Sequence, residues 1–541
     1  MSKLIIPENI FRYIAKSFVV SAVFVSSLFA QNDAGNQSIE LPAFVITGIR
    51  AVSVPIMKKK KTEFIPIVDD KFLVPKYDTE DFSLMNNNLP DKKEMTVFEH
   101  VKGYNGLLKL GVGTQTVPVG DFYFGFNKKN YLFNSHVYGS NIKEYVPYAG
   151  YNTSGAKVHF DYFVDNVAKY FPGVAIGAAG AAKRDQYNFY GSGTPSKLRK
   201  NEMYNWKVYL NNKFDKKLQY GLEVNSEKLK MKEEFTDEDL LDFSADAVYK
   251  FGAVGFGAKG NYKVQKVNDI TGYSRADLYG GMAYLDLNSS NVFEMKIGAK
   301  VVQFSDETFV APVINFAVFV EEGAALFLSY SGNADLITLH SFIKENRYFE
   351  KDITRIFQKK YSDIKVAVKY DFKDVFEINA GFHSAKYVNY HYFEDFNNDN
   401  RFNIGVAENV DEMGGFINAL INIKKYGEFF ADFEFQNITD IYGNKIPYKP
   451  MILADFSYGY LFNFGVYTKA MLNYSRYSYT NLINTQRTTN YINLGLLLKY
   501  NLFKMLAVTC NFQNLLNRKD YLLKNYQEKP LDIIVGIEYR W

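Results

Sequence analysis

From Tyr104 to the C-terminus, apolar and polar residues alternate with a period of two. The alternation is clearest in residues 157–165, 204–211, 364–371 and 428–436. Successive side chains of a strand point to opposite faces, so this pattern predicts strands with one face in an apolar medium and the other against water. About twenty-two such strands can be marked, with eighteen or twenty as acceptable counts, and they predict an all-β fold.

The connections between these strands alternate in length. Tight turns, such as residues 127–130 and 373–374, follow even-numbered strands, whereas longer polar loops, such as residues 332–362 and 393–412, follow odd-numbered ones. A soluble sandwich has no reason to sort its connections in this way. Short turns at one rim and long loops at the other are typical of a bacterial outer-membrane barrel. We therefore expect a transmembrane antiparallel β-barrel with short periplasmic turns and long extracellular loops.

The N-terminus has the layout of an export signal. Lys3, Arg12 and Lys16 precede an apolar run from Ser17 to Ala30 that ends in small residues. This order predicts a signal peptide over residues 1–30. The alternative is an N-terminal membrane anchor, but the run is shorter than the ~20 residues that a spanning helix needs. We expect residues 31–103 to form a periplasmic or lumenal segment and residues 104–541 the barrel.

Composition supports strands and excludes several classes of site. Aromatic residues make up 17% of the chain, and there are only 14 Pro and one Cys. Many aromatics and few prolines favour strands. A single Cys excludes a disulfide framework and a zinc site built from cysteines. The net charge of +4 is small beside 63 basic and 59 acidic residues, so it does not suggest nucleic acid as a partner.

The last strand carries a signal of its own. Its apolar positions are Ile533, Val535, Ile537, Tyr539 and Trp541, and the chain stops on this last aromatic. The pattern resembles the C-terminal recognition strand of outer-membrane proteins that the barrel-assembly machinery folds. The resemblance implies that this machinery and the outer-membrane lipid are partners of the chain.

Three stretches resemble TonB-dependent receptors, the twenty-two-stranded outer-membrane transporters. Residues 435–442 and 512–518 are similar to segments near the C-terminus of such barrels. Residues 40–50 are similar to the N-terminal segment where an energy-coupling box leads into the plug, and the box-like residues are Phe44, Val45, Ile46, Thr47 and Gly48. The resemblance implies a transport or channel function in the outer membrane and coupling to TonB. The alternative for residues 44–48 is a strand-forming tail with no coupling role.

The chain departs from these receptors where a folded plug should follow. Only residues 49–103 remain before the barrel, and they contain a four-lysine run at 58–61 and several prolines that interrupt any long element. The chain thus resembles a receptor without a complete plug. A barrel of this size would leave an aqueous hole, so it needs a filler: residues 51–99 folded inward, the long loops, or a separate plug or partner protein.

One long loop contains a calcium-like pattern. Asp395, Asn397 and Asp399 are spaced as the first oxygen ligands of a calcium loop. The position that should hold the bidentate Glu is Val406, and a solvated polar loop is the alternative. No other cofactor is indicated, and no catalytic motif is present, so we expect no enzyme activity.

The lumen should be wet and of mixed charge. The polar positions opposite the apolar stripe include Lys207, Glu223, Lys365, Lys369, Asp432, Glu434 and Lys499. They favour neither anions nor cations. Two functions remain: a transport or channel protein, and a non-transporting scaffold or surface-binding barrel.

Overall fold

The computed structural model describes residues 105–128, 130–165, 171–212, 217–289, 292–321, 323–351, 356–372, 375–423 and 426–541. The expected signal peptide, the segment 31–103 and the box-like residues 44–48 lie outside the described residues, so those expectations stay predictions.

Most of the described chain is β-strand, as the alternation predicts. The helical elements in it are the short α3 (Leu339–Glu345) and the 3-10 turn η2 (Lys232–Glu234). The strands are β1 (Gly106–Gly113), β2 (Thr116–Lys128), β3 (Tyr131–Ile142), β4 (Tyr151–Phe163), β5 (Ala175–Asn188), β6 (Leu198–Asn212), β7 (Leu218–Met231), β8 (Thr236–Phe251), β9 (Val254–Asp269), β10 (Gly272–Ser289), β11 (Phe293–Phe304), β12 (Glu307–Glu321), β13 (Ala324–Ser331), β14 (Asn333–Ile337), β15 (Ile356–Phe372), β16 (Phe376–Glu394), β17 (Asn403–Ile423), β18 (Gly427–Asp440), β19 (Ile452–Leu461), β20 (Val466–Ser475), β21 (Tyr491–Asn501), β22 (Leu506–Gln513), β23 (Tyr521–Leu523), β24 (Tyr526–Gln527) and β25 (Asp532–Arg540).

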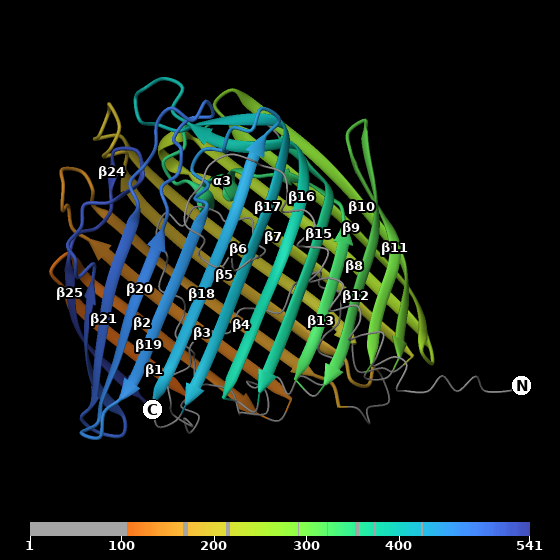
Figure 1. The fold of residues 1–541 in the computed structure, drawn as a ribbon, viewed down its shortest axis with the longest axis horizontal. Helices are drawn as coiled ribbons and strands as arrows, with labels where there is room; N and C mark the ends of the chain where they lie inside the picture. Colours follow the sequence, from red (N-terminus) through yellow and green to blue (C-terminus); the bar gives the residue numbers. More distant parts are fainter. Residues whose placement is uncertain are drawn as a thin grey trace, which may run out of the picture.

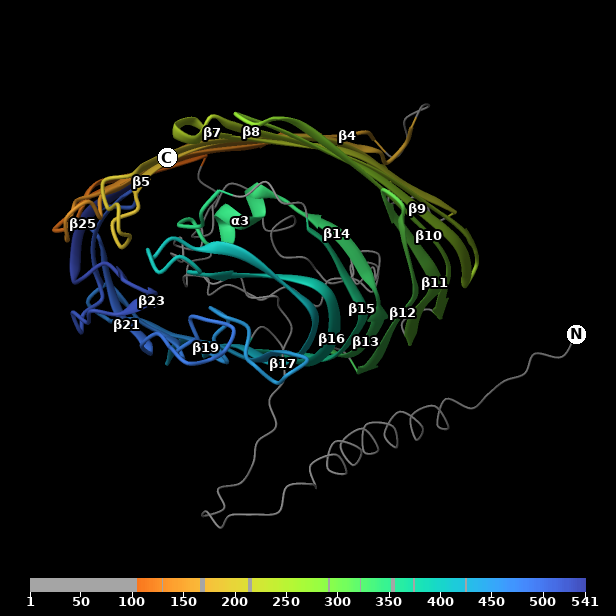
Figure 2. The same cartoon turned by 90° about the horizontal axis from the view of Figure 1, so that it is seen from above.

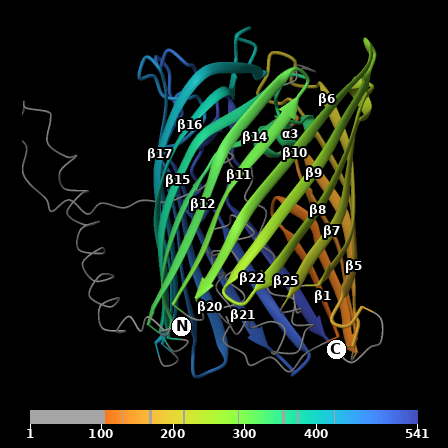
Figure 3. The same cartoon turned by 90° about the vertical axis from the view of Figure 1, so that its right-hand side faces the viewer.

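These strands form one closed antiparallel barrel. The main sheet has 23 strands, and pairing of β1 with β25 joins its two ends. Both β13 and β14 pair with β15, one above the other, so together they make a single pass. The barrel therefore has 22 passes, which confirms the predicted strand count. The strands run obliquely between two rims (Figures 1 and 3), and the view from above shows the closed ring (Figure 2).

The side chains are arranged as in a membrane barrel and not as in a soluble one. On β15, the apolar Val368 is 46% exposed whereas its charged neighbour Lys369 is only 3% exposed. The apolar stripe thus faces outward and the polar stripe faces the lumen. A soluble barrel would show the reverse. No helix among the described residues is long and apolar enough to cross a membrane.

Loop lengths follow the predicted parity with some exceptions. The connection 164–174 is long although it lies at the rim of short turns, and the opposite rim also has tight turns, such as residues 270–271. The expected loop 393–412 is partly strand, because β17 begins at Asn403. A membrane needs only ~9–11 residues per strand. The extra residues continue the wall beyond the membrane-spanning length, and some of them, such as Val410, belong to a buried apolar cluster.

The topology can be tested by cysteine labelling on intact cells. Tyr442 follows β18 at the rim of long loops and is 83% exposed; Phe464 lies in the turn between β19 and β20 and is 68% exposed. Outer-membrane barrels place their short turns in the periplasm. We expect a membrane-impermeant maleimide to label Tyr442→Cys, and to label Phe464→Cys only after the outer membrane is permeabilised. Labelling of Phe464→Cys in intact cells would show that the barrel is inserted in the opposite orientation.

Candidate functional site

Residues 332–351, which we call the cap, lead from β13 into the mouth of the barrel. Strand β14 first continues the wall, and α3 then lies within the ring of strands (Figure 2). Leu339, Phe342 and Phe349 of the cap are buried. The expectation that residues 332–362 form an exposed extracellular loop is therefore wrong for the cap. The physical reason is that its apolar side chains join a core inside the mouth.

The first turn of α3 is held by the β8–β9 wall. The backbone N–H groups of Leu339 and His340 donate to the two carboxylate oxygens of Glu238 at 2.9 and 3.0 Å. Gln265 on β9 donates its side-chain amide to the same carboxylate at 2.7 Å. A carboxylate at a helix N-terminus satisfies N–H groups that have no partner within the helix and interacts favourably with the helix dipole.

The last turn of α3 is held by the opposite wall. Glu345 accepts a hydrogen bond from His391 of β16 at 2.7 Å and forms an ion pair with Lys449 of the β18–β19 loop. His391 also contacts Gln358 of β15 at 3.0 Å through its other ring nitrogen. Burial alone would raise the pKa of Glu345, but the charges of Lys449 and His391 outweigh it and lower the pKa to about 2. We call Glu345, His391 and Lys449 the latch.

The chain beyond α3 is fixed to β5 and β6. The backbone carbonyl of Arg347 accepts hydrogen bonds from the Tyr187 hydroxyl at 2.8 Å and from the Arg199 guanidinium at 2.9 Å. That guanidinium is fully buried and lies against the rings of Phe189 and Phe349, 4.6 and 4.9 Å from their centroids. The cap is thus attached to the barrel on several sides.

An apolar core joins the cap to the surrounding strands and loops. Tyr348 of the cap stacks on Tyr526 of the last long loop, with ring centroids 3.9 Å apart. Buried aromatic rings are the largest contributors to such cores. The core contains Ile142, Tyr151, Tyr187, Phe189, Met203, Leu229, Met231, Val267, Leu339, Phe342, Ile343, Tyr348, Phe349, Ile356, Phe393, Phe402, Tyr448, Leu523 and Tyr526. Since these residues come from opposite walls, the core extends across the mouth.

Below the mouth, the lumen wall carries mixed charges, as predicted. The predicted inward residues Lys365, Lys369, Asp432 and Glu434 alternate with outward apolar residues on β15 and β18. Charges of opposite sign pair along this wall: Lys207 with Glu223 at 2.8 Å, Lys369 with Glu377 at 3.4 Å, and Lys499 with Glu538 at 2.7 Å. The wall therefore has no strong preference for one sign of charge.

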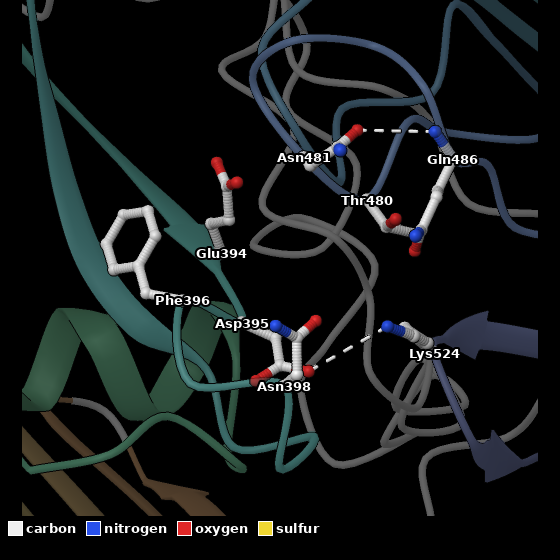
Figure 4. Close-up of a pocket in the computed structure, with 8 residues that line it drawn as sticks. All are labelled: Glu394, Asp395, Phe396, Asn398, Thr480, Asn481, Gln486 and Lys524. Atoms are coloured by element: carbon white, nitrogen blue, oxygen red, sulfur yellow. Dashed lines mark hydrogen bonds and ion pairs between the residues drawn. The ribbon is translucent and has the colours of Figure 1, made fainter.

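A polar cavity opens between the loops of the long-loop rim (Figure 4). Its volume is about 240 Å³. It is lined by Glu394, Asp395, Phe396, Asn398, Thr480, Asn481, Gln486 and Lys524. These residues come from the end of β16, the β16–β17 loop, the β20–β21 loop and the turn between β23 and β24, so only the folded barrel brings them together.

Two of the three predicted calcium ligands, Asp395 and Asp399, already have protein partners. The Asp395 carboxylate accepts from the backbone N–H groups of Asp399 and Asn400, both at 3.0 Å. The Asp399 carboxylate accepts from the Arg401 side chain at 2.7 Å. The described part of the chain has no group of three or more His, Cys, Asp or Glu that could hold a metal ion. Calcium at Asp395, Asn397 and Asp399 would have to displace Arg401, so it has no part in the function proposed below.

The two receptor-like segments near the C-terminus end strands β18 and β22 and begin the loops that follow them. Asn514, directly after β22, has a positive φ of 52°, donates to the carbonyls of Arg518 and Lys529 at 3.0 Å, and accepts from the Arg518 N–H at 3.1 Å. Asp440 accepts from the N–H groups of Tyr442 and Asn444 at 2.9 and 2.8 Å. Asn and Asp make such local hydrogen bonds readily. These segments therefore shape the outer loops.

The predicted assembly signal forms the strand that closes the barrel. β25 pairs with β22 on one side and with β1 on the other. Val535, Ile537 and Tyr539 are exposed on its outward face, as is expected of lipid-facing residues. The Trp541 ring lies 5.7 Å from that of Tyr539. Recognition of Ile533 to Trp541 by the assembly machinery stays a prediction.

The fold can now be compared with known structures. The ferric-catecholate import receptor Fiu from E. coli K12 has a TM-score of 0.59 at 9% identity over 82% of each chain. The siderophore receptor PiuA from Acinetobacter baumannii has a TM-score of 0.59 at 13% identity over 82% of each chain. The FrpB iron transporter from Neisseria meningitidis reaches 0.61 at 9% identity over 82% of each chain. The chain has the fold of these outer-membrane receptors.

The likeness is one of fold, because the identities are low. No protein-family model matches the chain, and no curated protein matches it in sequence. Together with the outward apolar stripe, the fold places the protein in the bacterial outer membrane. The latch and the Glu238 contact were missed by sequence reasoning. One residue in the sequence could have indicated the start of α3. Thr338 is a typical helix N-cap residue, and its side chain accepts a hydrogen bond from the Ser341 N–H at 3.1 Å.

Proposed function

We propose that this protein is an outer-membrane transport protein whose outer entrance is closed by its own cap and opens when the cap moves. The observation that carries the proposal is the apolar core that joins the cap to opposite walls of a barrel with a receptor fold. The barrel has three candidate fillers: residues 51–99, the long loops, and a separate protein. The described residues support the long loops.

A gate must be stable when closed and must also be releasable. The cap is attached by a small number of polar contacts, above all the latch and the Glu238 contact, together with the aromatic core. Segments that move in gating are usually the less stable parts of a fold. A solute or a partner that competed for one of these contacts would shift the cap toward an open state.

A second function follows if the cap never moves. A permanently closed barrel would act as a scaffold whose outer loops bind a surface ligand, and the rigid outer loops fit that role. The structural neighbours bear names of receptors and transporters, which supports transport over both scaffold and catalysis.

Partners follow from the same proposal. TonB would contact Phe44 to Gly48, and a separate plug protein would be needed only if residues 31–103 leave the periplasmic half open. Both remain predictions, since these residues lie outside the described part of the chain.

Planar-bilayer recordings test the proposal with three chains. These are the full protein, a form lacking residues 31–99, and a form in which residues 339–346 are replaced by a Gly-Ser linker of equal length. We expect a large conductance from the linker form and a small one from the full protein. Conductance that appears only when residues 31–99 are removed would make that segment the barrier. No conductance from any form would favour the scaffold.

A further inference from the structure

The polar cavity at the outer rim has the features of a preformed site. Asn481 accepts from the N–H groups of Thr485 and Gln486 at 3.1 and 3.3 Å, which fixes its loop. Asp395 fixes the facing loop in the same way. The Glu394 carboxylate accepts from the Leu482 N–H at 2.9 Å and ties the two loops together. Ligand sites are usually preformed in this manner.

The lining offers both donors and acceptors of hydrogen bonds. Glu394 and Asp395 are acceptors, Lys524 is a donor, and the amides of Asn398 and Gln486 are both. Side chains from the two loops face a common space, and Lys524 lies at its edge, 3.9 Å from the Asp395 carboxylate (Figure 4). A ligand that fits must donate and accept hydrogen bonds at several neighbouring atoms, as a set of adjacent hydroxyl groups does.

The charge of the lining argues against an anion. Two carboxylates and one ammonium group leave an excess of negative charge around the cavity. Like charges at contact distance repel even when partly screened by water. A phosphate or carboxylate group is therefore disfavoured, and a neutral ligand is not.

An exposed aromatic ring completes the site. Phe396 lines the cavity and is 51% exposed at the outer rim of the barrel. A ring of this kind presents a flat apolar face. Hydroxyl-bonding side chains beside a flat apolar face match a sugar ring, which has hydroxyl groups around its edge and C–H groups on its faces.

We propose that this cavity, between the β16–β17 and β20–β21 loops, binds a neutral sugar residue. Glu394 and the two amides bond its hydroxyl groups, and the Phe396 ring packs on its C–H face. The proposal names the class of solute that binds at the outer entrance. Binding itself does not depend on the proposed transport function, whereas passage of the bound sugar through the barrel rests on it.

Saturation-transfer NMR on the detergent-solubilised full chain tests the proposal. The neutral probes are glucose, galactose, mannose and N-acetylglucosamine. Two acidic probes are compared with them: glucuronate, which has a carboxylate and keeps the sugar ring, and gluconate, which has a carboxylate on an open chain. We expect saturation transfer to at least one neutral sugar, and binding of glucuronate and gluconate at least about tenfold weaker, a difference of about 1.4 kcal/mol. Equal or tighter binding of glucuronate, or no binding of any neutral sugar, would overturn the proposal.

Matched variants locate the binding. Phe396→Ala and Gln486→Ala change exposed side chains and should weaken binding at least about fivefold without unfolding the barrel. Phe235→Ala is the control, because Phe235 is 77% exposed in the β7–β8 connection and does not line the cavity. An equal loss in the control would contradict the assigned site. Because binding is measured without transport, its failure is distinct from a failure of the conductance test.

Discussion

The substitution Val368→Arg should destabilise the barrel in lipid by roughly 2–4 kcal/mol. Val368 is exposed on the outward face of β15, four residues before the strand ends at Phe372 on the rim of short turns. A membrane needs only ~9–11 residues of a strand, so Val368→Arg places a charge close to the bilayer midplane. Lys369→Arg is the matched control, because this position faces the lumen and already carries a charge. We expect it to cost less than about 1 kcal/mol, the usual range for substitutions that keep the local interactions.

The measurement is the free energy of folding into lipid vesicles. Arg is placed in turn at Ile364, Val366, Val368 and Tyr370, which share the outward face. The cost should peak near Val368, close to the middle of the membrane-spanning part of the strand, and should change when the bilayer is made thicker or thinner. A cost that ignores bilayer thickness would mean that this face is not in contact with lipid.

Glu345→Ala should release α3 from the barrel wall. Removing this carboxylate leaves Lys449 and His391 buried without their shared partner. Breaking a buried ion pair in this way typically costs 3–5 kcal/mol. The expected result is faster hydrogen exchange at the amide of Asn346, which bonds to the Phe342 carbonyl within α3. Each 1.4 kcal/mol of lost local stability raises its exchange rate about tenfold.

Glu233→Ala serves as the control for the latch. Glu233 pairs with Lys200 at 3.0 Å, and the two side chains are 41% and 30% exposed. Exposed pairs contribute about 0–1 kcal/mol. Exchange in α3 should therefore be unchanged in this variant. An equal change in both variants would mean that the latch does not hold the helix.

The Glu345 carboxyl of the latch should stay ionised in mild acid. Its pKa is lowered from 4.5 to about 2 by Lys449 and His391, against the effect of burial. A lowered pKa stabilises the folded cap above pH 4.5, and that contribution is lost only as the pH falls through about 2. Glu345 should therefore stay ionised down to pH 4, where an ordinary Glu is largely protonated. Its carboxylate carbon resonance in NMR, identified by its loss in the Glu345→Gln protein, should show no protonation shift between pH 7 and pH 4.

The barrel wall was predictable because its physical cause is local. Each pass alternates apolar and polar residues, so Val368 and Lys369 could be assigned to opposite faces without any knowledge of their neighbours. The limits appear where the wall leaves the membrane. Asn403 to Glu412 extend β17 beyond the ~9–11 residues that a membrane needs, and the sequence pattern there resembles a loop.

The cap could not be predicted because its contacts are distant in sequence. Glu238 bonds to Leu339, and Glu345 bonds to His391 and Lys449, and no periodicity connects these positions. The same holds for the polar cavity, whose lining residues come from separate loops. Residues 395–399 were noticed for calcium, but only the folded loops show that Asp395 also lines a cavity.

The central claim, that the cap closes the outer entrance, is tested most directly by the permeability of lipid vesicles that contain the Glu345→Ala protein. The vesicles hold a small hydrophilic dye, and its efflux is compared with that from vesicles containing the wild-type and Glu233→Ala proteins. The closed-cap structure predicts faster efflux from the Glu345→Ala vesicles and slow efflux from the other two. Equal efflux from all three, together with faster exchange in α3 of the Glu345→Ala protein, would contradict the claim, because the cap would then have loosened without opening a path.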